Sequence, residues 1–198
     1  MGRYRTPQHT LDFAAEPIKG SRFVAHIAPI HNKQEASSAI QALAAQRPDA
    51  SHHCWAWRLW EGKESRSADD GEPGGSAGKP ILAQIEGHDL YNIIVVVTRY
   101  YGGTKLGFGG LIRAYGGTAG KALDQVPVVW VEETVTLDFT HQYEDTRAID
   151  AALKKVDLQP SHTEFGAQVR VVVEVPLDQL EEVKKALLDY TSGRVLLS

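Results

Sequence analysis

The stretch NIIVVVTRYYG, residues 92–102, places the strictest constraint on the fold. Its segment 93–97 is an unbroken run of β-branched apolar residues, which is typical of a strand buried on both faces of a sheet. A helical pattern follows and ends before Pro127. Its apolar positions are Leu111, Ile112, Tyr115, Ala119, Ala122 and Leu123. The sequence therefore predicts a central strand that leads through a glycine-rich turn into a helix packed on the sheet.

The residues before this strand predict further elements of the same sheet. LDFAAEP and RFVAHIAPI flank the turn at Gly20 and Ser21 and predict a hairpin. A helix is expected over residues 33–46, capped by Asn32, and then a strand over HHCWAWRLWEG. Residues 62–80 contain turn formers throughout and predict a long loop. ILAQIEGHD then predicts a short helix or strand.

The C-terminal part of the chain shows shorter and more regular elements. From about residue 132 the pattern reads β-α-β-β-α, with RVLL as a candidate last strand, which predicts a split βαβ sandwich of ferredoxin-like type. We therefore expect an α+β protein with two domains. Residues 1–131 form an N-terminal β-α-β domain and residues 132–198 form the ferredoxin-like α/β sandwich.

Several classes of protein are disfavoured by composition. The single Cys54 cannot form an internal disulfide, and the N-terminus lacks the apolar core of a secretory signal. No apolar run approaches the roughly 20 residues that span a bilayer. These features predict a soluble, cytoplasmic protein with no membrane partner.

Charge is distributed unevenly along the chain. The net charge is −4, of which residues 132–198 carry −6 and the first 131 residues carry +2. Between residues 90 and 121 the charged side chains are all basic, namely Arg99, Lys105, Arg113 and Lys121. This acid-free segment favours contact with an anion.

The same segment has seven glycines between residues 102 and 117. A Gly-rich turn before a helix exposes backbone N–H groups that attract anions, whereas the same glycines also permit close packing on a sheet. The sequence is compatible with both interpretations. Nucleotide-binding loops are excluded by spacing, because Pro73 and Pro80 break the Walker A pattern and Ile112 replaces the third glycine of G-x-G-x-x-G.

Asp69, Asp70 and Glu72 form the other cluster of candidate residues. Three carboxylates in four residues could hold Mg²⁺ or act as a general acid and base, but acidic residues in a Gly/Pro loop also form solvated turns. His52, His53 and Cys54 are consecutive and provide neither zinc geometry nor a convincing nucleophile. No metal site is therefore predicted beyond the Mg²⁺ alternative, and no cofactor is expected.

Four segments together resemble the IMPACT/YigZ family in its two-domain bacterial form: KGSRF, HHCWAW, DDGEPGGSAGKP and VVVTRYYGGTKLGFGGLIRAYG. The resemblance covers about residues 15–125 and is looser beyond them. It departs from the family pattern at His53, Ser76 and Tyr101, where Asn, Thr and Phe are usual. The resemblance implies an N-terminal fold like that of a ribosomal-protein domain and of elongation factor G domain IV. It also implies a role in translation and no defined reaction.

These observations lead to a first hypothesis of a non-enzymatic factor that binds RNA or the ribosome. Cations would contact phosphates, and Tyr100 or Tyr101 would stack on bases. The candidate residues are Lys79, Arg99, Tyr100, Lys105, Gly107, Gly109, Gly110 and Arg113.

Two alternatives stay open. One is a phosphorylated-ligand binder or Mg²⁺-dependent enzyme that uses Asp69, Asp70 and Glu72. The other is an adaptor that binds a protein partner through the acidic C-terminal domain. The oligomeric state is left open.

Overall fold

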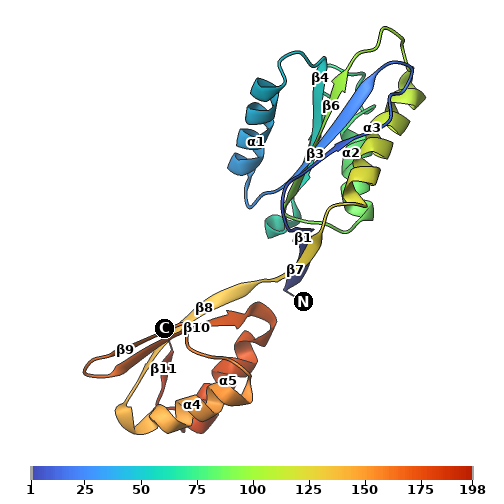
Figure 1. The fold of residues 1–198 in the computed structure, drawn as a ribbon. Helices are drawn as coiled ribbons and strands as arrows, with labels where there is room; N and C mark the ends of the chain where they lie inside the picture. Colours follow the sequence, from blue (N-terminus) through green and yellow to red (C-terminus); the bar gives the residue numbers. More distant parts are fainter. Residues whose placement is uncertain (1, 198) are drawn as a thin grey trace. The chain divides into compact units, whose positions relative to one another are not determined.

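The computed structural model describes residues 2–197, which divide into two compact units. The first unit comprises Tyr4–Val131, and the second comprises Glu132 onward together with Gly2 and Arg3. Both units mix helices with sheets (Figure 1), and the expected α+β class with two domains is confirmed. Within the described residues, no helix is both long and apolar enough to cross a bilayer.

The first unit is built around a five-stranded antiparallel sheet in the order β2-β3-β6-β4-β5. A separate two-stranded sheet pairs β1 with β7. The strands are β1 (Arg3–Pro7), β2 (Leu11–Ala14), β3 (Arg22–Pro29), β4 (His52–Arg58), β5 (Ser65–Ala68), β6 (Ile93–Tyr100) and β7 (Val128–Glu132). The helices are α1 (Lys33–Gln46), α2 (Gly78–Gly87) and α3 (Phe108–Leu123), with a 3-10 turn η1 (Glu61–Lys63).

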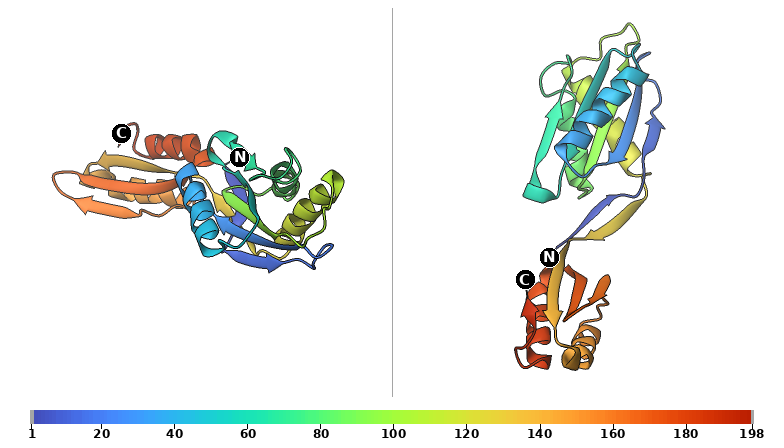
Figure 2. Two further views of the ribbon diagram at one scale, coloured as in Figure 1. Left: turned by 90° about the horizontal axis from the view of Figure 1, so that it is seen from above. Right: turned by 90° about the vertical axis from the view of Figure 1, so that its left-hand side faces the viewer.

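Strand β6 occupies the centre of the sheet and is buried on both faces, as its apolar run predicts. Ile93, Val95 and Val97 belong to the core beneath α2 and α3, whereas Ile94 and Val96 belong to the core beneath α1. Figures 1 and 2 show α1 on one side of the sheet and α2 and α3 on the other. The first unit thus has three layers.

The prediction of a loop over residues 62–80 is wrong near both ends of this range. Ser65–Ala68 form β5, which pairs with Trp55–Arg58 of β4, and α2 begins at Gly78. An edge strand gains its backbone hydrogen bonds from one neighbour and needs few apolar side chains, so the polar sequence SRSA gives no strand signal. Strands β1 and β7 were likewise not predicted. They pair with each other outside the main sheet.

The second unit is a four-stranded antiparallel sheet in the order β11-β8-β10-β9, packed against two helices. This order places each helix in a crossover between two strands separated by a third, which is the ferredoxin-like topology. The elements are β8 (Thr134–His141), η2 (Tyr143–Asp145), α4 (Thr146–Lys155), β9 (His162–Phe165), β10 (Val169–Pro176), η3 (Leu177–Gln179), α5 (Leu180–Tyr190) and β11 (Leu196–Leu197).

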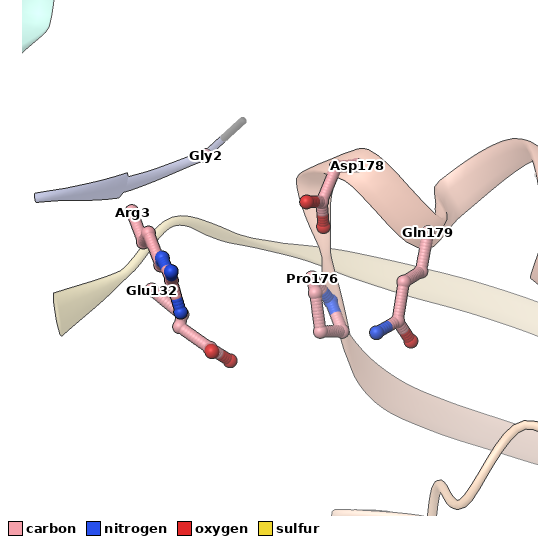
Figure 3. Close-up of a pocket in the computed structure, with 6 residues that line it drawn as sticks. All are labelled: Gly2, Arg3, Glu132, Pro176, Asp178 and Gln179. Atoms are coloured by element: carbon pink, nitrogen blue, oxygen red, sulfur yellow. The ribbon is translucent and has the colours of Figure 1, made fainter. Parts of the chain in front are cut away.

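A pocket of about 170 Å³ opens in the second unit. Figure 3 shows Arg3 and Glu132 on one side of it and Asp178 and Gln179 on the other. None of the residues that the sequence singled out lines this pocket. The candidate residues all lie in the first unit.

Candidate functional site

Asp69 anchors the loop that carries Asp69, Asp70 and Glu72, here called the acidic loop, to the start of α2. Its Oδ2 accepts a hydrogen bond from the Gly75 N–H at 2.8 Å, and its Oδ1 accepts from the N–H groups of Ala77 at 2.9 Å and Gly78 at 2.8 Å. Burial would raise the pKa of this carboxyl, but the three N–H donors outweigh burial and lower it. Asp69 therefore already accepts hydrogen bonds from two of the anion-attracting N–H groups at this helix start.

Asp70 holds the loop against β4. It adopts a left-handed conformation with φ of 43°, and its Oδ2 accepts a hydrogen bond from the His53 N–H at 2.6 Å. Its carbonyl oxygen lies 2.7 Å from Nδ1 of His52. The Asp70 carboxylate is nevertheless half-exposed, unlike that of Glu72.

Glu72 lies at the centre of a buried polar network. Its Oε1 accepts hydrogen bonds from Arg99 Nη1 at 2.6 Å and from the Tyr115 hydroxyl at 2.7 Å, and His52 Nε2 lies 3.8 Å away. A second guanidinium nitrogen of Arg99, Nη2, donates to Ser21 Oγ at 3.3 Å. The network joins the acidic loop to β6 and α3.

Cys54 lies beside this network on β4, with its Sγ 2.9 Å from the Asp69 carbonyl oxygen. Burial raises the pKa of its thiol to about 12, and the charges of Glu72, Asp70 and Asp69 add to the effect of burial, whereas a hydrogen bond with Tyr115 opposes it. Burial also raises the pKa of Tyr115. Both groups stay neutral near pH 7, so Cys54 lacks the thiolate that nucleophilic catalysis requires.

The carboxylates of the acidic loop thus accept hydrogen bonds from other groups of the fold. Asp69 is bonded to α2 and Glu72 to Arg99 and Tyr115. Within residues 2–197, no group of three or more His, Cys, Asp and Glu side chains is arranged to hold a metal ion. Two of the three carboxylates of the Mg²⁺ alternative are thus already hydrogen-bonded within the fold, which leaves that alternative the Asp70 carboxylate as its exposed group.

Some glycines of the acid-free segment serve close packing, whereas others shape the helix start that could attract an anion. A Cβ on Gly102 would lie 1.9 Å from the carbonyl carbon of Gly20, so this glycine is required by close packing between two turns. Gly107 has a positive φ of 75° and precedes α3 with open space around it. Packing explains Gly102, whereas Gly107 shapes an exposed helix start.

The start of α3 is the exposed part of the acid-free segment. The first N–H groups of a helix have no intrahelical partner, and Gly107, the N-cap residue of α3, has no side chain that could accept hydrogen bonds from them. Gly109 and Gly110 lie in this first turn, and the position of a Cβ on Gly109 is 3.6 Å from Arg113 Nη1. A cation therefore lies beside the open N–H groups.

Exposed aromatic side chains lie near Arg113 and Lys105 in the sequence. Tyr101 is 49% exposed and Phe108 is 55% exposed, and Lys105 is exposed in the turn between them. We call the surface formed by Tyr101, Lys105, Gly107, Phe108, Gly109, Gly110 and Arg113 the junction surface. In Figure 1 the turn between β6 and α3 lies at the top of the first unit.

Three of the predicted residues lie elsewhere. Arg99, expected to contact phosphate, is instead buried and paired with Glu72, because its strand ends beneath the acidic loop. The Tyr100 ring lies 4.5 Å from the Arg22 guanidinium and is less exposed than Tyr101. Lys79 is exposed on α2, beside Asp69 rather than in the junction turn.

Phe108 and Ser21 were missed by the sequence. Phe108 precedes Leu111 by three residues and Tyr115 by seven, so helical spacing assigns it to the core. It is exposed instead. The role of Ser21 gives no signal in the sequence, because its hydroxyl meets Arg99 and the Gly102 N–H only in the folded chain.

Comparisons with known proteins place this site in a family. Residues 19–123 match the Impact N-terminal domain, and residues 139–194 match a domain of unknown function (DUF1949). The chain is 37% identical over 187 residues to the IMPACT family member YigZ of Escherichia coli (strain K12), covering 92% of this chain and 91% of that protein.

Further relatives extend over nearly the whole chain. It is 31% identical to an IMPACT family member of Haemophilus influenzae, covering 100% of this chain and 97% of that one. A solved structure described as a hypothetical protein is 33% identical, with a TM-score of 0.71 over 100% of this chain and 97% of that chain. The acidic loop and the junction surface both lie in the segment that matches the Impact N-terminal domain, and the chain belongs to the IMPACT family.

Proposed function

We propose that this protein is a non-enzymatic, translation-related factor that binds RNA, free or within the ribosome, through the junction surface. The observation that carries the proposal is the exposed start of α3, where Arg113 lies beside the first turn and the exposed Lys105 precedes the N-cap residue Gly107 by two positions. The translational role is what resemblance to the IMPACT family implies. Binding in the cytoplasm is part of the same proposal.

The chemistry of the junction surface suits a single-stranded polynucleotide. Cations and helix N–H groups contact phosphate oxygens without reading sequence. Exposed aromatic rings provide stacking platforms that accept any base, and Tyr101 and Phe108 are such rings. No acidic residue lies between positions 90 and 121, so this segment itself contributes no charge that repels a polyanion.

A Mg²⁺-dependent enzyme or phosphorylated-ligand binder has less support from the acidic loop. Asp69 and Glu72 accept hydrogen bonds within the fold, which leaves Asp70 as the exposed carboxylate of the three. A thermal-shift screen of nucleotides and phosphorylated metabolites, with and without Mg²⁺, tests this alternative. A ligand at 100 times its dissociation constant adds about 2.7 kcal/mol to the free energy of unfolding.

The proposal is tested by fluorescence anisotropy with a labelled single-stranded 12-mer RNA between 50 and 200 mM salt. Binding is expected to weaken as salt rises, because each neutralised phosphate releases counterions. Lys105→Ala should reduce the slope of log K against log salt by about 0.7 to 1. The matched control is Lys154→Ala, which removes an exposed lysine of the second unit and should leave the slope unchanged. A wild-type chain that does not bind the 12-mer at 50 mM salt would disprove the proposal.

A further inference from the structure

A second cluster of polar groups lies further along α3. A pocket of about 170 Å³ opens between residues 15–18, which lead from β2 toward β3, and one side of the helix. The helix wall consists of Arg113, Gly117, Thr118 and Lys121, together with Ala114. Apart from Arg113, these residues lie outside the junction surface.

Thr118 is the unusual member of this wall. Its side chain is buried, with 2% of the residue exposed, and within residues 2–197 its hydroxyl oxygen has no hydrogen-bond partner. A helical threonine normally bonds a carbonyl of the preceding turn, and buried polar groups are nearly always paired. The wall of this pocket therefore contains a residue whose hydroxyl the fold itself leaves unpaired.

The charges around Thr118 indicate which ligand would fit. Arg113 and Lys121 lie on either side of it along α3, separated by a helical rise of about 12 Å. Both side chains are exposed and line the pocket. Glu16 contributes one carboxylate from the opposite wall, which leaves the pocket with one net positive charge.

The surface between the cations is bare. Apart from the neighbouring backbone of α3 itself, no atom of residues 2–197 lies within 4 Å of the position that a Cβ on Gly117 would take, so a ligand can approach the helix backbone there. A phosphate group is the chemistry that suits two cations, a hydroxyl donor and an open backbone.

We propose that this pocket binds a backbone phosphate of the same RNA that contacts the junction surface. The inference rests on the proposed function, because Arg113 belongs to both surfaces. An RNA strand bound at the start of α3 then continues along the helix and places one phosphate between Arg113 and Lys121. An oxygen of this phosphate accepts a hydrogen bond from the Thr118 hydroxyl. Thr118 and Lys121 are thereby added to the residues that bind RNA.

The decisive variant is Thr118→Val, which removes the hydroxyl and keeps the branched shape. Its matched control is Thr98→Val on β6, where another buried hydroxyl has no partner within the described residues. Neither change removes an intramolecular hydrogen bond, so both variants should fold at least as stably as the wild type. Only Thr118→Val should weaken binding of the labelled 12-mer, by about tenfold, because a hydrogen bond to a charged group is lost.

Two variants that change a charge test the pocket through the salt slope and the affinity, which a purely structural role of these residues would not change. Lys121→Gln should lower the salt slope by about 0.7 to 1, as one phosphate contact is lost. Glu16→Gln should strengthen binding by about two- to fivefold, because it removes a repulsive charge at an exposed site. Weaker binding by Glu16→Gln would overturn the inference that the Glu16 carboxylate repels a phosphate in this pocket.

The outcomes separate this inference from the proposed function. If the 12-mer binds and Thr118→Val binds it as well as the wild type, the pocket inference is wrong while the proposed function stands. If the wild type does not bind the 12-mer, both fail as statements about RNA. Thermal shifts with inorganic phosphate then show whether the pocket is a site for a free phosphate group, which requires a stabilisation that Thr118→Val abolishes. No stabilisation of the wild type by phosphate overturns the phosphate pocket as well.

Discussion

Arg99 Nη1 lies 2.6 Å from Glu72 Oε1, and the two side chains are only 6% and 5% exposed. This pair connects the acidic loop to the end of the central strand. Removing one partner of a buried ion pair leaves an uncompensated charge and costs about 3 to 5 kcal/mol.

We therefore predict that Glu72→Gln and Arg99→Met each lower the free energy of unfolding by about 3 to 5 kcal/mol in urea denaturation. The double variant should lose much less than the sum of the two, because it leaves no unpaired charge. Additive losses would show that the two residues act independently.

Replacing Asp69 by Asn should destabilise the first unit by about 1 to 2 kcal/mol at pH 7, because the helix start loses a charged acceptor. The folded pKa of Asp69 is lowered, so its contribution is present above the unfolded value of about 3.9 and is lost as pH falls through the folded pKa. The stability difference between wild type and variant should be constant above about pH 5 and shrink below about pH 4. Denaturation curves between pH 3 and 7 measure it, and a difference unchanged down to pH 3 would contradict the assignment.

Gly102→Ala should lower the free energy of unfolding by about 3 kcal/mol or more, since a Cβ would overlap the Gly20 backbone. Gly117→Ala is the matched control in α3, where the added carbon would meet no described atom within 4 Å beyond the helix's own backbone. It should stabilise the protein by about 1 kcal/mol through helix propensity. Equal effects of the two changes would argue against a packing role for Gly102.

Phe108→Ala should weaken binding of the 12-mer by about 1 to 3 kcal/mol without changing the salt slope, because stacking involves no counterion release. Phe165→Ala removes an even more exposed phenylalanine, 69% exposed, from the second unit and should have no effect. Anisotropy titrations at several salt concentrations separate the two quantities. A changed slope for Phe108→Ala would point to a rearranged cationic surface instead.

The thiol of Cys54 should resist thiol reagents at pH 8 in the native protein and react rapidly in denaturant, because burial raises its pKa to about 12. Since the folded pKa is raised, the neutral thiol contributes stability below the unfolded value of about 8.5, and that stability declines as pH rises toward 12. Cys54→Ala should lack this alkaline decline. Rapid labelling of the native chain at pH 8 would contradict the burial of the thiol.

The sequence predicts well those parts of the fold in which periodicity and burial coincide. The run at Ile93–Val97 becomes the central strand, and the alternation in residues 135–140 gives β8 of the second unit. Strand β5 is not predictable in this way, because an edge strand with the sequence SRSA buries little apolar surface.

The candidate site is harder to predict from sequence than the fold. Glu72 and Arg99 are far apart in the chain, and only the sheet brings them together. An arginine in a basic segment is expected at the surface, whereas Arg99 is buried by that pairing. Thr118 has the spacing of a core residue, and only the structure shows that its hydroxyl is unpaired.

The carboxylate of Asp69 occupies the start of α2 in the way that a bound phosphate occupies the helix start of a nucleotide-binding loop. The segment DDGEPGGSAGKP therefore contains the anion that binds its own helix start, namely the Asp69 carboxylate. A nucleotide phosphate would have to displace this carboxylate, whose effective concentration is very high because it belongs to the same chain. The glycines that make this segment look like a phosphate loop serve instead to close it.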